Sequence, residues 1–415
     1  MSDKKIISLF TGAGGLDLGL EAAGFQTAVA LEKDSAAVAT LRHNVVSGVI
    51  DWPIIDQDIH LVSTDKLLKK GSLKKGEAAL LVGGPPCQPF SKSGYWKNGD
   101  SLRLNDPRAD TLTAYLRVLD EARPFGYILE NVEGLSYRGK SEGVEFLRRA
   151  IESLGYSFKM LILNAADFGV PQIRKRVLIV GNQDRDEVAT PAPTHTDPND
   201  PSLFSHEQTW MTAWDALHDI DEDDRDPTLQ ASGRWAELLP TIPEGENYLW
   251  HAAHPKRSDR DWSGYSLFGW RRRYWSFLLK LSKELPSWTI TAQPGSAIGP
   301  FHWKNRRLSM RELARLQTFP DEYEVIGGRT AYQRQIGNAV PSALGEFVGR
   351  YLRAHLFGEA GEDRKPLSLL PWKATRGRRP EPVVEDLPEA YLPLVADHDP
   401  HPGTGLGPGA VSRRG

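Results

Sequence analysis

Short apolar runs alternate with helical patterns over the first 182 residues, and this alternation constrains the fold more than any other feature. The apolar runs occupy Lys5–Phe10, Thr27–Leu31, Ala78–Val82, Tyr127–Leu129 and Val177–Val180. The helical patterns occupy Leu16–Ala23, Ser35–Val46, Thr111–Glu121 and Glu145–Leu154. Alternation of this kind is typical of a parallel sheet with helices on both faces. The sequence therefore predicts an α/β fold with a doubly wound, mostly parallel sheet over residues 1–182.

The pattern changes after residue 182. Residues 183–300 are rich in Pro, Asp, His and Trp with few clear periods, so we expect a separate, smaller domain over residues 183–304. Helical spacing returns at Ser309–Gln317, where Ser309 fits an N-cap with Glu312 three residues on, and a second helix follows Pro341. These helices define a further segment over residues 305–357. Residues 358–415 are rich in proline, glycine and charge, which predicts a partly disordered tail.

Charge is unevenly distributed along the chain. The whole sequence carries a formal net charge of −3, which by itself does not favour a nucleic-acid partner. Between His251 and Pro320, however, there are 13 lysine and arginine residues and only 4 acidic ones. Because physiological salt screens each charge beyond about 8 Å, a regional excess matters more for phosphate binding than the total does. The excess predicts a phosphate-binding surface, and a solvated surface with chance clustering is the alternative.

The composition excludes several classes of protein. The single cysteine, Cys87, cannot form an internal disulfide, and no cysteine-rich pattern predicts a metal site. No apolar run approaches the roughly 20 residues that a membrane span requires. The N-terminus passes from charged residues straight into an apolar run, without the pattern of a secretory signal. We therefore expect a cytoplasmic protein without a metal and without a membrane partner.

A glycine-rich turn follows the first apolar run. Phe10-Thr-Gly-Ala-Gly-Gly leads directly into a helical pattern, and glycines at such a turn let backbone amides approach an anionic group. Glu32 ends the second run, where its carboxylate can accept hydrogen bonds from ribose hydroxyls. Asp58 follows a further short strand, within reach of an adenine edge. Together these residues predict a cofactor that carries a nucleoside. For the glycines alone, a tight turn without a ligand is the alternative.

Cys87 lies in the segment Gly83–Ser91, directly after the apolar run that ends at Val82. A lone cysteine is usually a small core residue. This one stands between two prolines and Gln88-Pro89, in a rigid polar loop at the carboxyl end of a strand, where folds of this class bind ligands. The setting favours a nucleophile over a core role. A free thiol has a pKa of about 8.5, so its ionisation needs help from cationic neighbours.

Two further motifs place charged side chains at the same edge of the predicted sheet. Glu130 follows Tyr127–Leu129, and a carboxyl group at a strand end suits general-acid work on a ring nitrogen. Helix capping is the alternative for Glu130. Arg174 and Arg176 precede the last run, and strand alternation puts both on one face, so that both can point into one site. A solvated surface pair is the alternative for the arginines.

Six motifs then occur in order along the chain. They are Phe10-Thr-Gly-Ala-Gly-Gly, Pro86-Cys87-Gln88, Glu130-Asn131-Val132, Gln172-x-Arg174-x-Arg176, Arg311-Glu-Leu-Ala-Arg-Leu-Gln317 and Gln335-Ile-Gly-Asn338-Ala-Val-Pro341. Together they resemble the motifs of bacterial DNA (cytosine-5) methyltransferases of the restriction–modification kind. The resemblance covers residues 5–182 and 305–357, and the part between them lies where this family has its target recognition domain. It implies a Rossmann-like fold and an enzyme that depends on S-adenosylmethionine.

The resemblance implies a cofactor pocket to which both ends of the matched region contribute. Phe10 would stack on the adenine of S-adenosylmethionine, Glu32 would hold the ribose, and Asp58 would meet the adenine amine. The residues that would complete the pocket are Gly12, Gly14, Gly15, Ile59, Pro86, Asn338 and Val340. The segment 305–357 would therefore fold back onto the first domain. One departure is Lys33, which stands where some relatives carry an aromatic residue against the adenine.

For catalysis, the resemblance implies that Cys87 attacks C6 of a cytosine, that Glu130 bonds N3 and the exocyclic amine, and that Arg176 bonds the ring O2. Arg174 and Ser91 would position the loop or the flanking phosphates. The target base would first rotate out of the duplex. The residues expected to contact DNA are Ser91, Arg271, Arg272, Arg273, Arg306 and Arg307. The neighbouring aromatic residues, expected mostly in a core, are Trp262, Tyr265, Trp270, Tyr274 and Trp275.

The leading hypothesis is a monomeric DNA (cytosine-5-)-methyltransferase that forms a covalent Cys87–C6 adduct with double-stranded DNA. It would be the modification part of a restriction–modification or phage-defence system, with a cognate restriction endonuclease as a partner. A tRNA cytosine-5 methyltransferase shares the motif set, but the long insert favours DNA. A catalytically silent DNA-binding relative is a second alternative, and the intact Pro-Cys and Glu-Asn-Val segments count against it. A nicotinamide oxidoreductase would leave Cys87 without a role.

Overall fold

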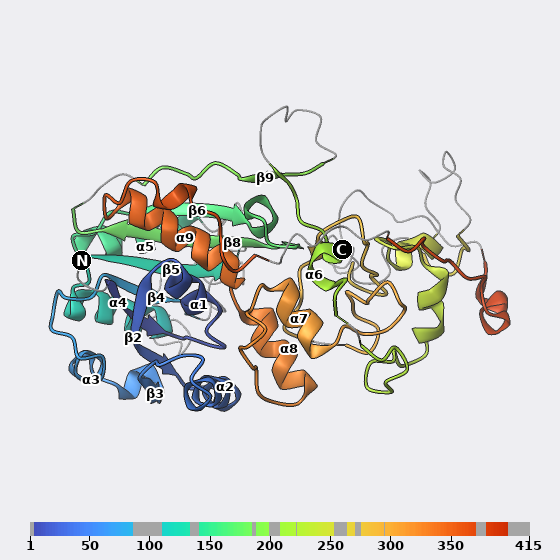
Figure 1. The fold of residues 1–415 in the computed structure, drawn as a ribbon, viewed down its shortest axis with the longest axis horizontal. Helices are drawn as coiled ribbons and strands as arrows, with labels where there is room; N and C mark the ends of the chain where they lie inside the picture. Colours follow the sequence, from blue (N-terminus) through green and yellow to red (C-terminus); the bar gives the residue numbers. More distant parts are fainter. Residues whose placement is uncertain are drawn as a thin grey trace, which may run out of the picture.

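The computed structural model describes residues 4–85, 110–132, 141–184, 188–198, 208–220, 222–252, 264–269, 275–293, 295–370 and 379–396. Pro86, Cys87, Ser91 and Arg271–Arg273, which the sequence singled out, lie outside these ranges. Figure 1 shows a domain built around a sheet next to a second body of short helices and irregular chain. Within the ranges given, none of the helices has the length and apolar character needed to cross a bilayer.

The first domain contains a seven-stranded sheet with the order β3-β2-β1-β4-β5-β8-β6. The strands are β1 (Lys4–Leu9), β2 (Phe25–Glu32), β3 (Ile54–Asp56), β4 (Leu80–Gly83), β5 (Gly126–Val132), β6 (Lys159–Asn164) and β8 (Lys175–Asn182). The first five of these are parallel, whereas β8 lies antiparallel between β5 and β6. The predicted mostly parallel sheet is therefore confirmed.

Helices cover both faces of this sheet, as a doubly wound fold requires. On one face, α3 (Thr64–Lys70), α4 (Asp110–Ala122) and α5 (Ser141–Ser153) pack in a core that includes Leu67, Val118 and Ile151. On the other face, α1 (Gly15–Ala22) and α9 (Ser342–His355) pack in a second core with Leu20 and Phe347. Because α9 comes from the far end of the chain, residues 342–355 complete the domain that residues 4–182 begin (Figure 1).

The crossing of α1 and α9 depends on glycine. A Cβ atom placed on Gly19 of α1 would lie 2.2 Å from the carbonyl oxygen of Ser342 and 2.5 Å from the backbone nitrogen of Glu346. Both distances are shorter than any van der Waals contact allows, so only a residue without a side chain lets the two helices approach this closely. The glycine at position 19 of α1 thus allows the C-terminal helix α9 to pack against the start of the chain.

Several predicted boundaries are confirmed. α2 spans Ser35–Val46, where Asp34 caps its first turn by accepting hydrogen bonds from the backbone nitrogens of Ala36 and Ala37. α7 spans Met310–Leu316, and Ser309 and Glu312 form the expected reciprocal capping box. Several elements were not predicted, among them the helix α3, the edge strand β6 and the helix α8 (Arg329–Asn338). The sequence also did not reveal that the strand around Val177–Val180 runs against its neighbours.

The region expected to be a separate domain, residues 183–304, is divided between two cores. One core joins α6 (Ala213–Leu217), Leu281 and Ile290 to α7, α8 and Trp52 of the first domain. The other core contains Leu238, Tyr248, Phe268 and Phe277 together with Leu387 and Tyr391 from the tail. We call residues 235–280, whose described members build most of this last core, the small domain. Part of the predicted insert therefore shares its core with the first domain.

Candidate active site

Glu130 and Arg176 meet at the edge of the sheet where the parallel strands end. Glu130 lies near the end of β5, and Arg176 lies near the start of the antiparallel neighbour β8, with Val132 opposite Arg176 in the register. The Nε atom of Arg176 lies 3.0 Å from Oε1 of Glu130, and the two side chains are 9% and 14% exposed. Two residues 46 positions apart in the sequence thus form a largely buried ion pair, as their motifs suggested.

The protonation of Glu130 follows from this setting. Burial raises the pKa of the Glu130 carboxyl above its usual range, and the guanidinium groups of Arg176 and Arg174 act in the opposite direction. Burial also lowers the pKa of Arg176, while Glu130 raises it. A carboxyl group whose pKa is raised can hold a proton closer to neutral pH, and it can then donate a hydrogen bond to a neighbouring acceptor.

The segment that leads to Cys87 starts beside this carboxyl group. β4 ends at Gly83, which pairs with Leu129 of β5. A Cβ atom placed on Gly84 would lie 2.8 Å from Oε2 of Glu130, so any other residue at this position would displace the carboxylate or the turn. Gly84 is a site residue that sequence reasoning treated only as part of a loop. Cys87 follows it by three residues and lies outside the described residues.

Arg174 does not match the expectation that it positions a loop or phosphates. Its side chain is fully buried, and its guanidinium donates to the carbonyl oxygens of Ile290 (3.0 Å), Ala339 (3.0 Å) and Gly337. These bonds join the start of β8 to the end of α8. The partners of Arg174 are backbone groups of the chain itself, because the later segment packs over it.

Gln172 and Gln317 are further buried links that sequence reasoning did not assign. The side-chain oxygen of Gln172 accepts a hydrogen bond from Ile290 N (3.2 Å), and its nitrogen donates to Oε1 of Gln317 (3.2 Å). Gln317 donates in turn to the carbonyl oxygen of Ile336 (2.6 Å). Gln172 begins one of the six motifs and Gln317 ends another, so the sequence did single them out. The structure shows that their side chains connect these two motifs to each other.

The predicted cofactor residues gather at the ends of β1 and β2. Phe10 and Gly12 have φ values of 55° and 57°, a backbone conformation that favours glycine. Oε2 of Glu32 accepts a hydrogen bond from the backbone nitrogen of Gly12 (2.7 Å), and Oε1 accepts from those of Lys33 and Asp34 (2.7 Å each). Glu32 is therefore held rigidly against the glycine turn. Among the residues that the structure describes, no atom lies within 4 Å of a Cβ placed on Gly12, so open space adjoins the turn in this part of the chain.

Asp58 borders the same edge one strand further out. Its Oδ1 accepts a hydrogen bond from His60 N (3.0 Å) and so caps the short helix η1 (Ile59–Leu61), whose Ile59 is buried. Its Oδ2 accepts a hydrogen bond from Nζ of Lys33 (2.8 Å), and this bond holds the pKa of Asp58 below its usual range. Lys33, which stands where some relatives carry an aromatic residue, is thus the partner of Asp58.

The junction between α8 and α9 reaches the glycine turn from the other side. A Cβ atom placed on Gly15 would lie 2.4 Å from the carbonyl oxygen of Val340, so the backbones of these two predicted pocket residues touch. Asn338 ends α8, and its side chain is exposed. The structure therefore brings Gly15 and Val340 together, although they come from opposite ends of the chain.

The predicted DNA-binding residues differ in their settings. Arg306 is 1% exposed, and its guanidinium bonds both carboxylate oxygens of Glu312 at 2.8 and 2.9 Å. Its Nε also donates to Oδ1 of Asp224 (2.8 Å). Arg306 thus stabilises the start of α7 and lacks the exposed position that a phosphate contact requires. Arg307 is half-buried and donates to the Ser232 hydroxyl (2.9 Å).

Of the aromatic residues expected in a core, Trp262, Trp270 and Tyr274 lie outside the described residues, and Tyr265 and Trp275 differ in their settings. Tyr265 packs against the core of the small domain, as expected. Trp275 is instead 54% exposed, and its ring stands edge-on to that of Trp288 with 5.6 Å between the centroids. Trp288 lies in β11 (Ser287–Trp288), which pairs with β7 (Gln172–Ile173) directly before Arg174. The exposed Trp275 therefore contacts a tryptophan of the strand that pairs with the residues directly before Arg174.

Comparison with known proteins identifies relatives over most of the chain. The family model described as C-5 cytosine-specific DNA methylase matches residues 4–354. The type II methyltransferase M.SacI of Streptomyces achromogenes is 38% identical over 378 residues, which are 85% of this chain and 93% of that protein. The type II methyltransferase M1.HphI of Haemophilus parahaemolyticus is 32% identical over 351 residues, which cover 82% and 84% of the two chains.

Solved structures share the fold at lower sequence identity. A putative DNA modification methyltransferase encoded within a prophage of Escherichia coli superposes with a TM-score of 0.57 at 24% identity, covering 85% of this chain and 99% of that one. The methyltransferase EhMeth of Entamoeba histolytica superposes with a TM-score of 0.55 at 14% identity, covering 86% and 99%. At these identities the likeness concerns the fold alone.

Proposed function

Because the chain belongs to the C-5 cytosine-specific DNA methylase family, we propose that it methylates C5 of an extruded cytosine in duplex DNA with Cys87 as nucleophile and Glu130 as acid. The enzyme is a DNA (cytosine-5-)-methyltransferase, and its family depends on S-adenosylmethionine. The observation that carries the residue assignment is the buried pair of Glu130 and Arg176 next to Gly84. This acid and this cation lie beside Gly84, which precedes the single cysteine by three residues in the sequence.

The proposed chemistry explains why both groups are needed. C5 of cytosine is a poor nucleophile, and addition of the Cys87 thiolate to C6 turns C5 into an enamine-like carbon. Negative charge then develops on the ring, and a proton or hydrogen bond from Glu130 at N3 stabilises it. S-adenosylmethionine supplies the electrophilic methyl group when it is bound. Loss of the C5 proton to a base and expulsion of the Cys87 thiolate restore the aromatic ring.

The groups at the glycine turn fit the cofactor. Glu32 presents a carboxylate fixed by three backbone nitrogens, and its oxygens retain lone pairs that can accept hydrogen bonds from ribose hydroxyls. The open space beside Gly12 can take the methionine part, and Phe10 can cover the adenine. Asp58 would accept from the adenine amine, with Ile59, Pro86, Asn338 and Val340 around it. Each of these assignments is part of the proposal.

The biological setting is proposed from the relatives. Two of them are named type II methyltransferases, a term that belongs to restriction–modification, so we infer a cognate restriction endonuclease that cuts the same sequence when it is unmethylated. The extruded base comes from duplex DNA, with Ser91 and the Arg271–Arg273 run among the proposed phosphate contacts. The exposed Trp275 is an additional candidate for contact with DNA.

Methyl transfer from radiolabelled S-adenosylmethionine tests this function directly. Purified chain is given duplex DNA in one reaction and tRNA in a matched one, and DNA from cells that express the chain is sequenced after bisulfite treatment. We expect incorporation into duplex DNA only, and protected cytosines within one short sequence context. Incorporation into tRNA with none into DNA would contradict the proposal, as would bisulfite conversion identical to that of cells without the chain.

A further inference from the structure

We propose that residues 359–396, which lie beyond the part matched by the family model, form a strap that joins the first domain to the small domain and keeps the small domain ordered for DNA binding. The strap has two described parts, a first anchor at 359–370 and a second anchor at 379–396. Its effect on DNA binding rests on the proposed function, whereas its effect on the order of the small domain does not.

The first anchor satisfies a carboxylate that is buried in the first domain. Glu346 of α9 is fully buried, and its oxygens accept hydrogen bonds from the backbone nitrogens of Ser368 (2.8 and 2.9 Å) and Leu369 (2.9 Å). The Ser368 hydroxyl donates a further bond (2.9 Å), and Arg350 donates from one helical turn away (2.8 Å). A buried carboxylate is costly without such donors. Most of the donors of Glu346 come from the strap.

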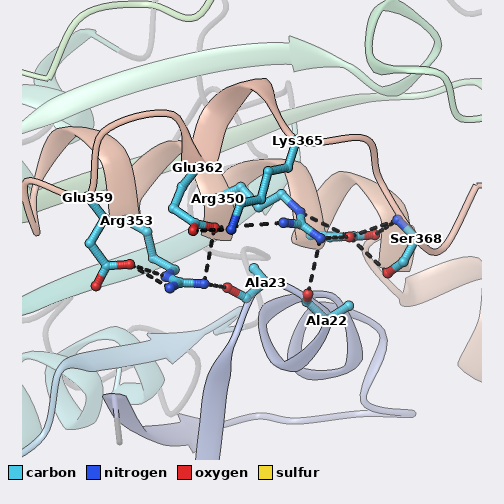
Figure 2. A network of polar contacts seen from close by, with 9 residues as sticks. Ala22, Ala23, Arg350, Arg353, Glu359, Glu362, Lys365 and Ser368 are labelled. Atoms are coloured by element: carbon cyan, nitrogen blue, oxygen red, sulfur yellow. Dashed lines mark hydrogen bonds and ion pairs between the residues drawn. The ribbon is translucent and has the colours of Figure 1, made fainter. Parts of the chain in front are cut away.

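The first anchor also supplies acids to a cluster of arginines. Oε2 of Glu362 lies 3.2 Å from Nη1 of Arg353 and 3.7 Å from Nη1 of Arg350, and Glu359 forms an ion pair with Arg353. Figure 2 shows these side chains between α9 and the end of α1, where Arg353 also donates to the carbonyl oxygen of Ala23. The strap therefore neutralises cations at the α1–α9 crossing that would otherwise repel each other.

The second anchor is part of the core of the small domain. Leu387 and Tyr391 are 7% and 6% exposed, and both belong to the cluster formed by Leu238, Tyr248 and Phe268. Two backbone bonds fix the strap there, from Glu385 N to the carbonyl oxygen of Pro240 (3.1 Å) and from Ala396 N to that of Ser266 (3.1 Å). Without the second anchor this core would face water.

Charge complements these apolar contacts. Lys280 of the small domain is 1% exposed, and burial lowers its pKa to about 8, while the carboxylates of Glu244 and Glu385 raise it. Glu385 comes from the strap, so part of the compensation for a buried ammonium is supplied by the second anchor. Arg379 also forms an ion pair with Glu284, which follows the small domain in the sequence. The strap therefore supplies both an apolar and a charged contribution to the small domain.

The strap adds a third covalent crossing between the two parts of the molecule. The chain first leaves the sheet after β8 and returns before α7, and the strap crosses once more from α9 to the small domain. The eight residues between the anchors can extend to at most about 30 Å, so they limit how far the small domain moves from the first domain. A protein that holds DNA between two domains pays less conformational entropy on binding when their separation is already restricted.

The first test compares two truncations of the full chain. Removal of 379–415 takes away the second anchor, and removal of 397–415 is the matched control. We expect the first truncation to speed amide hydrogen exchange in 238–252 by about tenfold or more and to weaken duplex DNA binding by a similar factor. Binding of S-adenosylhomocysteine should stay within about twofold of the full chain, because the first domain keeps its own cores. The control should match the full chain in all three.

Unchanged exchange and unchanged DNA affinity after removal of 379–415 would overturn the proposal. If that truncation fails to fold, Tyr391→Ala in the full chain replaces it, with the same direction expected. If the full chain itself does not bind DNA, the proposed function fails, while the exchange rates still report on the strap.

A second test separates joining from mere covering. A protease site replaces residues 371–378, and exchange and DNA affinity are measured before and after cleavage. Weaker DNA binding after cleavage, while the 379–415 fragment stays bound and the exchange rates in 238–252 stay unchanged, supports the strap as a connection. Identical DNA affinity before and after cleavage would show that continuity has no role and would contradict the joining claim.

Discussion

The carboxyl group of Glu130 lies where water solvates it poorly, with 14% of its side chain exposed and Arg176 3.0 Å away. Burial favours the protonated form and the cation favours the ionised form, so the site can exchange a proton with a substrate at low cost. Glu130→Gln keeps the shape of the side chain but cannot transfer a proton to N3. We expect single-turnover methyl transfer to slow by about 10²- to 10⁴-fold. Single-turnover rates with labelled cofactor measure this effect.

Two controls make the Glu130 result specific. Glu145→Gln changes an exposed carboxylate on α5 that pairs with Arg149, and it should leave the rate unchanged. Duplex DNA affinity of the Glu130→Gln variant should stay within about threefold, because the role of Glu130 concerns the reacting ring. A normal single-turnover rate, or a loss of DNA binding as large as the loss of rate, would rule out the assigned role.

Asp17 is a second buried carboxyl group, in the first turn of α1. It is 2% exposed, burial raises its pKa from 3.8 to about 7, and its Oδ1 has no hydrogen-bond partner within the described part of the chain. The folded protein therefore holds this proton up to about pH 7, whereas the unfolded chain releases it near pH 4. Since the native state binds more protons in this window, its stability falls as pH rises from about 4 to 7.

We expect Asp17→Asn to remove this pH dependence. The pKa shift of Asp17 corresponds to about 4 kcal/mol at most. The free energy of unfolding of the variant, relative to that of the wild type, should therefore rise by up to this amount from pH 4 to pH 7. Denaturant titrations of both proteins at pH 4, 5.5 and 7 measure the difference. A difference that stays constant over this range would mean that Asp17 is ionised throughout the range in the folded protein.

At the scale of elements, the crossing of α1 and α9 determines how the two ends of the chain meet. A Cβ on Gly19 would meet backbone atoms of α9 at 2.2 and 2.5 Å, and backbone cannot move aside as a flexible side chain can. We expect Gly19→Ala to lower the free energy of unfolding by about 1–3 kcal/mol, as overpacked cores do. Chemical denaturation measures the loss.

Gly328→Ala serves as the matched control for this crossing. Gly328 precedes α8 with φ near −67°, and a Cβ placed on it has no neighbouring atom within 4 Å in the described part of the chain. Its substitution should lower the free energy of unfolding by at most about 1 kcal/mol, because Ala is a poorer N-cap than Gly and meets no steric clash there. Equal effects of the two substitutions would show that the close approach of the helices is not what requires glycine.

Elements with strong local signals were predicted from the sequence, and those that depend on distant contacts were not. α2 was predicted with its observed bounds because its apolar residues are helically spaced after Asp34, and α7 because Ser309 and Glu312 form a capping box. β6 was not predicted, since it is an edge strand with Ile162 half exposed and a weak pattern. The antiparallel direction of β8 was also out of reach, because direction depends on the path of the chain between strands.

Over the whole molecule, the motifs predicted which residues gather but not all of what they bind. Glu130 and Arg176 meet as expected. Arg174 and Arg306 are instead buried against partners such as Ile290 and Asp224, which lie far away in the sequence and which no local pattern could indicate. The ion pair of Lys33 and Asp58 joins residues 25 positions apart. The tail gave no periodic signal because its second anchor contributes single apolar residues to a core that other segments build.

The central claim concerns the bond between Cys87 and the target base, and covalent trapping tests it most directly. The chain is incubated with S-adenosylmethionine and duplex DNA that carries 5-fluorocytosine at the position identified by bisulfite sequencing. A fluorine at C5 cannot leave as a proton does, so the adduct persists after methyl transfer. We predict a denaturant-resistant complex with DNA that maps to the peptide containing Cys87 and is absent for Cys87→Ser. Formation of the complex by Cys87→Ser, or its absence while normal DNA is methylated, would contradict the account.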